Sequence, residues 1–225
     1  MIALLLASTA FAQDFAFPTT PTHYGYWYPT SYFDHGGNTD YTCNSDAYSG
    51  HNGSDFGAGS WAGMNAGRDI TAAAGGTVTY VHDGEVDTCT GGCSSPANVV
   101  QIQHPNGLVS VYGHFKRWSI TVQAGDTVDC GDVLGEMGSS GMSTGPHLHF
   151  GVYSGQTALD PFEGACNSSP SMWVSQGNYQ GLPALTCDNT SGGSGGGGCG
   201  SVTSGHLAAG LFLLPLGLFR RRRDS

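Results

Sequence analysis

Short runs of alternating hydrophobic and polar residues fill the middle of the chain and predict β-strands. Each run is rich in β-branched residues or alternates with period two, and each is bounded by Gly, Asn or Pro. The runs are residues 76–82, 98–103, 107–113, 119–123, 127–130 and 147–153. Asn106-Gly107 lies between two of them and is typical of a hairpin turn. No segment has a long helical period, so we expect a mainly β fold with an antiparallel, sandwich-like sheet.

The two ends of the chain have other patterns. Residues 1–12 are apolar and end in Ala10-Phe11-Ala12, which predicts a cleaved export signal. Residues 191–200 form a Gly/Ser-rich linker that contains Cys199, and residues 201–225 combine an apolar stretch with a terminal Arg cluster. This Gly-Cys, apolar and Arg sequence resembles the MYXO-CTERM type of sorting signal. The resemblance implies attachment at the surface of a bacterium, and a plain C-terminal membrane anchor is the alternative.

Composition and charge exclude several functional classes. The 225 residues suffice for one domain with appendages, and the 37 glycines and 11% charged residues argue against a helical bundle. Between Gln13 and Cys199 there are 16 acidic and 3 basic residues, a net charge of −13. Such a surface repels phosphate backbones, so no nucleic acid partner is expected.

The cysteines suggest disulfides in an exported protein, because none forms a CxxC pair typical of structural zinc sites. Six precede the linker, and we expect them to be oxidised in pairs. Cys89 could pair with Cys93 across two glycines, and Cys166 with Cys187. Cys43 with Cys130 would then remain by elimination. Cys199 is the odd cysteine, consistent with a separate role in sorting.

Among the nine histidines, three groups could take part in metal chemistry. His147 and His149 are two apart on a predicted strand, so their imidazoles face the same way. His51 and Asp55 lie in a Gly-rich segment that we interpret as a loop. One Asp and two His would leave a fourth position on zinc open, as in catalytic sites. His114 ends a predicted strand and could be a fourth ligand, a proton-transfer group or a buried structural residue.

The order of these motifs is recognisable. HNGSDF (51–56), then YGHF (112–115), then GSSGMSTGPHLHF (138–150) resemble the lysostaphin/LytM-type zinc peptidoglycan endopeptidases. The resemblance covers about residues 46–162. It implies a LytM-type metallopeptidase domain over 46–165, between an aromatic-rich segment (13–45) and a C-terminal extension (166–190). The aromatic residues of the N-terminal segment are expected to fill a core.

The resemblance also implies roles for individual residues. His51, Asp55 and His149 would be the ligands of Zn²⁺, and His114 and His147 the catalytic histidines beside it. Asp69 is a rival to Asp55, because Asn65-Ala66-Gly67-Arg68-Asp69 imitates the first motif with Asn in place of His. His104 is interpreted as structural support for the hairpin. His23, His35, His82 and His206 are interpreted as surface or satisfied core residues.

The implied activity is metal-assisted hydrolysis of peptide bonds in peptidoglycan stem peptides or cross-bridges. The Gly- and Ser-rich residues 138–145 would leave room for a slender peptide, although a tight loop needs the same composition. Two alternatives share the fold. One is a non-catalytic LytM-type module that activates a cell-wall amidase, and the other is a general secreted metalloprotease acting on Gly-rich proteins.

Overall fold

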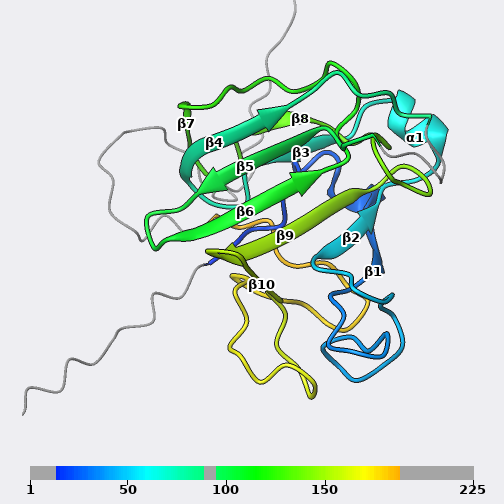
Figure 1. The fold of residues 1–225 in the computed structure, drawn as a ribbon, viewed down its shortest axis with the longest axis vertical. Coiled ribbons are helices and arrows are strands. Elements are labelled where there is room, and N and C mark those ends of the chain that lie inside the picture. The colour runs from blue at the N-terminus through cyan, green and yellow to red at the C-terminus, as the bar shows by residue number, and fades with distance from the viewer. Residues whose placement is uncertain (1–13, 89–94, 188–225) are drawn as a thin grey trace, which may run out of the picture. The chain divides into compact units, whose positions relative to one another are not determined.

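An antiparallel sheet of eight strands dominates the computed structural model, which describes residues 14–88 and 95–187 (Figure 1). Its strand order is β1-β2-β9-β6-β5-β4-β7, and β10 pairs with β9. The strands are β1 (Tyr28–Ser31), β2 (Ser54–Gly57), β4 (Gly76–His82), β5 (Val99–Gln103), β6 (Leu108–Gly113), β7 (Thr127–Val128), β9 (Leu148–Ser154) and β10 (Thr157–Leu159). A second sheet pairs β3 (Asp69–Thr71) with β8 (Val133–Glu136). The described helices are the 3₁₀ turn η1 (Tyr24–Tyr26) and the single-turn α1 (Trp61–Asn65).

The mainly antiparallel β fold is therefore as predicted. Four of the expected strands match β4, β5, β6 and β9 within a residue at each end, and the fifth shortens to β7. The expected hairpin joins β5 to β6, where Gly107 has a φ of 90° that favours glycine. Asn106 accepts a hydrogen bond from the amide of Leu108, which fixes the turn.

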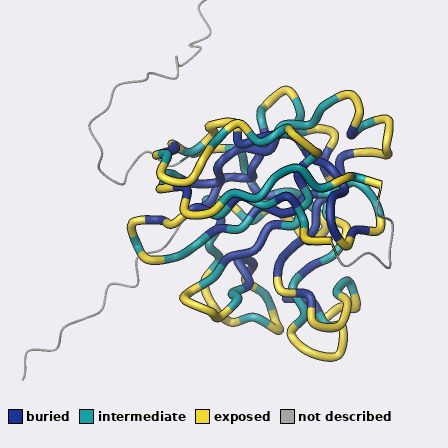
Figure 2. Tube along the Cα trace, turned by 45° about the horizontal axis from the view of Figure 1, so that its top comes forward, coloured by how far each residue is buried: buried dark blue, intermediate teal, exposed yellow. Residues whose placement is uncertain are grey.

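The core lies on one face of the large sheet. Alternate residues of β9 are buried there, namely Leu148, Phe150 and Val152. Residues from both ends of the described chain complete this core: Phe15 and Trp173 form an isolated bridge, and their rings are 6.2 Å apart. Buried segments run through the middle of the molecule and exposed ones form the peripheral loops (Figure 2).

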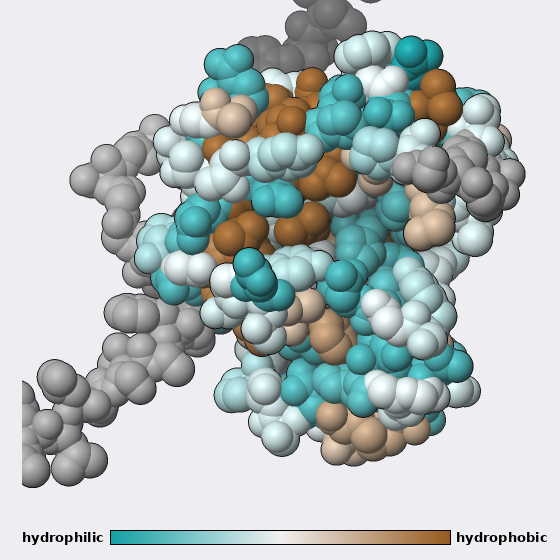
Figure 3. Space-filling view, viewed as in Figure 1, coloured by the Kyte–Doolittle hydropathy of each residue, from teal (hydrophilic) through white to brown (hydrophobic). Residues whose placement is uncertain are grey.

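The aromatic N-terminal segment fills this core only in part. Trp27 and Tyr32 are buried, as expected, but Tyr26 and Tyr28 are exposed. The N-terminal segment therefore supplies both core and surface residues. On the face seen in Figure 3, hydrophobic patches lie mostly over β4, β5 and β6, and hydrophilic surface predominates on the loops below β2 and β10.

The strand predicted at residues 119–123 is wrong. These residues make irregular hydrogen bonds instead: the amide of Thr121 donates to the carbonyl of Leu134, and that of Ile120 to the Asp83 carboxylate. Their β-branched composition is satisfied by partial burial against the core, without a strand partner. The loop expected at 51–56 is also wrong in part, because Ser54–Gly57 forms strand β2.

The predicted disulfide pairing is wrong where the structure describes it. Cys43 is bonded to Cys166, and Cys130 to Cys187. The N-terminal segment passes beside residues 160–187, so the Cα atoms of Cys43 and Cys166 come within 5.2 Å. Sequence spacing carries no information about such a long-range approach. Cys89 and Cys93 lie outside the described residues.

The export signal (1–12), the linker (191–200) and the sorting segment (201–225) also lie outside the described residues, as does His206. Within residues 14–88 and 95–187, the helices are too short and too polar to cross a bilayer.

Candidate metal centre

Three neighbouring strands bring the candidate residues together. In the pairing of β2 with β9, Asp55 is directly opposite His149, and in the pairing of β9 with β6, His149 is opposite Gly113. His51 precedes β2 by three residues, and His114 directly follows β6. Residues far apart in sequence therefore form one row across the sheet.

Gly53 permits the close approach of His149. A Cβ at position 53 would lie 2.6 Å from the imidazole of His149 and 2.7 Å from the carbonyl oxygen of Phe150. The glycine that suggested a flexible loop in the sequence thus leaves space for a site residue.

The geometry of His51, Asp55 and His149, called here the ligand cluster, fits a zinc ion. Asp55 Oδ1 is 3.1 Å from His51 Nε2 and 2.9 Å from His149 Nδ1, and the two nitrogens are 3.3 Å apart. Ligands about 2.0–2.1 Å from a tetrahedral ion are about 3.3 Å from one another. The three atoms therefore occupy one face of a tetrahedron of suitable size, and they could hold a metal ion.

Hydrogen bonding outside the ligand cluster orients His51. Its Nδ1 donates to the carbonyl oxygen of Tyr32 at 2.6 Å, so the neutral imidazole presents a lone pair on Nε2. That lone pair faces the oxygen of Asp55, which is also an acceptor. Two buried acceptors that face each other without a donor are unfavourable, and a cation bound between them would interact with both.

Asp55 is buried, with 6% of its surface exposed. Burial alone would raise its pKa, but the close contacts of its Oδ1 with His149 at 2.9 Å and His51 at 3.1 Å outweigh burial and hold the pKa well below its usual range. Charge interactions with His147 and His149 act in the same direction. The carboxylate is thus held in the ionised form that a metal ligand requires.

His114 and His147 lie beside the ligand cluster, with ring centroids 4.5 Å apart. Each donates Nδ1–H to a backbone carbonyl: His114 to Ser140 at 2.6 Å, and His147 to Gly145 at 2.8 Å. This leaves Nε2 of each ring for proton exchange, and Nε2 of His147 is 3.7 Å from Asp55 Oδ1. Two imidazoles placed in this way can accept or return a proton.

The backbone of His114 has a φ of 66°, in the left-handed region that few non-glycine residues adopt. Such strain costs about 1–3 kcal/mol and is found most often at functional sites. Burial, followed by the charge of His147, lowers the pKa of His114 to about 4. The ring is thus neutral and acts as an acceptor at physiological pH.

The Gly/Ser-rich segment 138–145 forms a tight loop that holds these two histidines. Ser139, Ser140 and Ser143 are buried, and their hydroxyls bond within the loop or to the carbonyl of Phe115. The amide of Gly138 donates to the carbonyl of His114. Packing therefore explains the small residues at positions 138–143. Thr144 and Gly145 instead line the cleft described below.

Tyr48 is a site residue that the sequence analysis missed. Its ring stacks on His51 with centroids 4.2 Å apart, and its hydroxyl donates to Asp55 Oδ2 at 3.3 Å. Burial and the adjacent Asp55 charge raise the pKa of this tyrosine. Its position three residues before the HNGSDF motif was the available indication.

Asp69, the rival carboxylate, lies elsewhere. It belongs to β3 in the two-stranded sheet, where its Oδ2 is 3.2 Å from Nδ1 of His23. Other histidines also have protein partners, as expected: His35 pairs with Asp160, and His82 with Glu85.

His104 supports the hairpin region, as the sequence analysis expected. It is buried, and its Nδ1 donates to the carbonyl of Gly75 at 2.9 Å. Its Nε2 lies 2.8 Å from Ser110 Oγ. Burial lowers the pKa of His104 and keeps the ring neutral.

A cleft of about 540 Å³ opens beside the ligand cluster. Asp55 and His147 line it, so a molecule bound there would meet the cluster. One side consists of Thr144, Gly145 and Pro146, from the loop before β9. The other side comes from β1 and residues 45–48, and includes Tyr28, Thr30, Asp46 and Tyr48.

Comparison with known proteins identifies a family and several relatives of this chain. Residues 49–161, half of the chain, match the model of peptidase family M23. A DD-carboxypeptidase/endopeptidase of Neisseria meningitidis is 39% identical over 87 residues, which cover 39% of this chain and 19% of that protein. A peptidoglycan DD-endopeptidase of Vibrio cholerae is 33% identical over 84 residues, covering 37% of this chain and 19% of that protein.

The chain spans about a fifth of the length of these curated relatives. Among solved structures, a zinc containing peptidase from Vibrio cholerae has 22% identity and a TM-score of 0.47, over 71% of this chain and 41% of that one.

Proposed function

The chain belongs to peptidase family M23, and on that premise we propose that it is an exported zinc metalloendopeptidase that cleaves peptide bonds in peptidoglycan stem peptides or cross-bridges. The observation that carries this proposal is the completeness of the site. His51, Asp55 and His149 converge at separations that suit zinc, and His114 and His147 stand beside them with Nε2 left for proton exchange.

The proposed chemistry divides between the ion and the chain. When bound, zinc would polarise the scissile carbonyl and lower the pKa of a water molecule towards ~7. The neutral imidazole of His114 or His147 takes a proton from the attacking water, and one of them then supports the oxyanion or protonates the leaving amine. Their hydrogen bonds to Ser140 and Gly145 hold the rings in the required tautomer.

Export is supported by two disulfides, Cys43–Cys166 and Cys130–Cys187, because such bonds persist in oxidising compartments. Peptidoglycan as the substrate is supported by the similarity to the peptidoglycan DD-endopeptidase of Vibrio cholerae. Attachment to a membrane or cell surface through residues 201–225 remains a prediction from the sequence.

The two alternatives are less well supported. A non-catalytic module that activates an amidase would not need a complete ligand cluster with two further histidines. A general protease for Gly-rich proteins has the same chemistry and differs only in substrate.

The test is digestion of isolated sacculi by the purified, zinc-loaded protein, with the released fragments analysed by mass spectrometry. We expect fragments with new peptide termini from the wild-type protein and none from His149→Ala. Release of fragments only when an amidase is added would favour the activator. Cleavage of Gly-rich proteins but not of sacculi would favour the general protease.

A further inference from the structure

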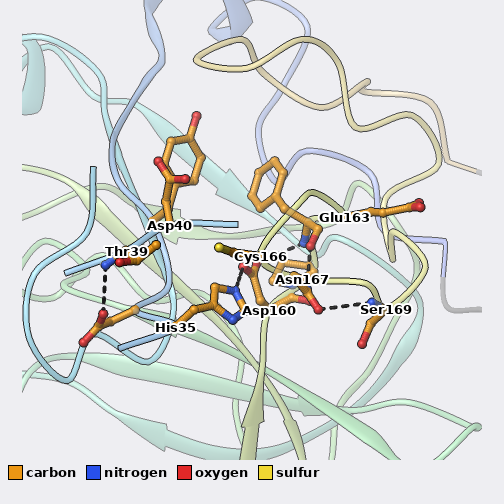
Figure 4. A network of polar contacts seen from close by, with 12 residues as sticks. His35, Thr39, Asp40, Asp160, Glu163, Cys166, Asn167 and Ser169 are labelled. Carbon is orange, nitrogen blue, oxygen red and sulfur yellow. Dashed lines mark hydrogen bonds and ion pairs between the residues drawn. The ribbon is translucent and has the colours of Figure 1, made fainter. Parts of the chain in front are cut away.

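The wall of the cleft formed by β1 and residues 45–48 lies outside the part of the chain that matches the family model. Residues from the C-terminal side of the domain hold it in place. Cys43 is bonded to Cys166, and buried Asp160 accepts a hydrogen bond from His35 at 2.8 Å (Figure 4). These contacts therefore fix the position of the wall relative to the rest of the domain.

Asp46 is the acidic residue of this wall. Its Oδ2 accepts hydrogen bonds from Nε2 of Gln180 at 2.8 Å and from the hydroxyl of Tyr179 at 2.5 Å, and this hydroxyl also lies 2.9 Å from Asp40 Oδ2. Both donors are neutral, so they fix the carboxylate without cancelling its charge. In the part of the chain that the structure describes, Asp46 forms no ion pair and its Oδ1 has no hydrogen-bond donor.

Two carboxylates, Asp46 and Asp55, line the cleft, and no Lys or Arg is among its described lining residues. Lys116 pairs with Glu136, and the guanidinium of Arg68 lies 4.0 Å from the centroid of the Tyr26 ring. Arg117 lies over Trp118. A zinc ion in the ligand cluster would more than balance the charge of Asp55, so Asp46 would be the remaining negatively charged residue of the cleft lining.

We propose that Asp46 is a specificity-determining residue, which selects peptide substrates that carry a primary ammonium group near the scissile bond. The inference rests on the proposed peptidase function. An ammonium group that enters the cleft meets an oriented carboxylate whose second oxygen is free to accept its hydrogen bond. A peptide with a carboxylate at the same place meets repulsion instead.

The test uses the zinc-loaded full chain and a series of Gly-rich hexapeptides. Each peptide carries one Lys, placed at each position in turn, and each has a partner with Nε-acetyl-Lys at the same position. At the best position we expect the wild-type protein to prefer the Lys peptide by about tenfold in kcat/KM. Dissociation constants from calorimetry should show the same preference, and added salt should reduce it.

Asp46→Asn keeps the shape and the hydrogen bonds of the side chain but removes the charge, so the preference should fall to about twofold or less. Tyr179→Phe keeps the ring and removes one donor that orients Asp46, so an intermediate preference is expected. Asp14→Asn is the matched control, because it removes one negative charge at an exposed position away from the cleft. Zinc content and melting temperature of each variant establish that it is folded.

The outcomes separate the two claims. If no peptide is cleaved but the Lys preference appears in binding and is lost in Asp46→Asn, the peptidase proposal fails and the role of Asp46 stands. An unchanged preference in Asp46→Asn contradicts the inference, as does equal binding or no binding of both peptides to the wild-type protein.

Discussion

A buried histidine lies on the side of each end of strand β6, His104 near Leu108 and His51 in the row of residues that includes Gly113. The two histidines differ in how their polar atoms are satisfied. At the Leu108 end, His104 has a carbonyl for its proton and a serine hydroxyl for its lone pair. At the Gly113 end, His51 has a carbonyl for its proton, but its lone pair faces Asp55 and His149. Both ring nitrogens of His104 are paired with protein atoms, whereas the lone pair of His51 needs a cation as its partner.

This difference gives a physical criterion for ligand histidines. Burial does not separate the two sites, because both His51 and His104 are almost fully buried. The separating feature is whether each acceptor has a donor. We therefore expect substitutions at the two ends of β6 to have different kinds of effect.

The largest effect is expected for His149→Ala. Two remaining ligands hold zinc poorly, so zinc content and peptidoglycan hydrolysis should be lost together. Atomic spectrometry beside turnover on sacculi measures both quantities. His104→Asn is the matched control from the other end of the strand and should keep about one zinc per chain.

His114→Ala should separate metal binding from catalysis. The substitution leaves the ligand cluster intact and removes a proton-transfer group, so the rate should fall by about 10²–10⁴-fold while zinc stays. His147→Ala should resemble it, with some loss of zinc because His147 adjoins the ligand strand. Loss of zinc in His114→Ala would make His114 a ligand, and full activity would make it merely structural.

His104→Asn should destabilise the fold by about 1–3 kcal/mol in the free energy of unfolding, because at least one of the groups paired with His104 loses its partner. Urea denaturation of the zinc-loaded protein measures the change. A substitution here that removed zinc without a loss of stability would overturn the distinction between the two ends.

The cost of His104→Asn should also depend on pH. Burial lowers the pKa of His104 in the folded state, whereas the unfolded value is about 6.5. The folded state therefore binds fewer protons, and the stability that neutral His104 contributes is present above about pH 6.5 and is lost as pH falls below it. The difference in unfolding free energy between wild type and His104→Asn should shrink from pH 7.5 to pH 5. A constant difference would contradict the assignment.

The smallest effect on zinc is expected for Asp69→Ala. Asp69 pairs with His23 in the two-stranded sheet, so zinc content should stay at one per chain. Asp55→Ala, measured in parallel, should lose it. The opposite result would make Asp69 the carboxylate ligand.

Sequence patterns predicted the central strands because their alternation reflects one buried and one open face. Leu148, Phe150 and Val152 are buried where the HLHFGVY pattern places them. Short strands such as β2, β3 and β10 were missed, since their residues do not show alternation over a sufficient length. Residues 119–123 were expected to form a strand but do not, which shows that β-branched residues can be partly buried without pairing to another strand.

The candidate site was predictable where it depended on motifs, and not where it depended on distant approaches. His51, Asp55, His149, His114 and His147 were all proposed from motif order, and the structure brings them together. Tyr48 was missed because its contact with Asp55 depends on loop geometry. Two contacts were not predictable in this way: the disulfide between Cys43 and Cys166, and the hydrogen bond from Tyr179 to Asp46. Both join segments that are far apart in the sequence, and local patterns do not encode which distant segments lie side by side.

Anomalous X-ray scattering at the zinc edge, from crystals of the full chain grown with zinc, tests the central claim most directly. The account predicts one strong peak in the described part of the molecule, bounded by His51 Nε2, Asp55 Oδ1 and His149 Nδ1, with no peak at His104. A peak held by His114 and His147 without Asp55, or no peak at the ligand cluster, would contradict it.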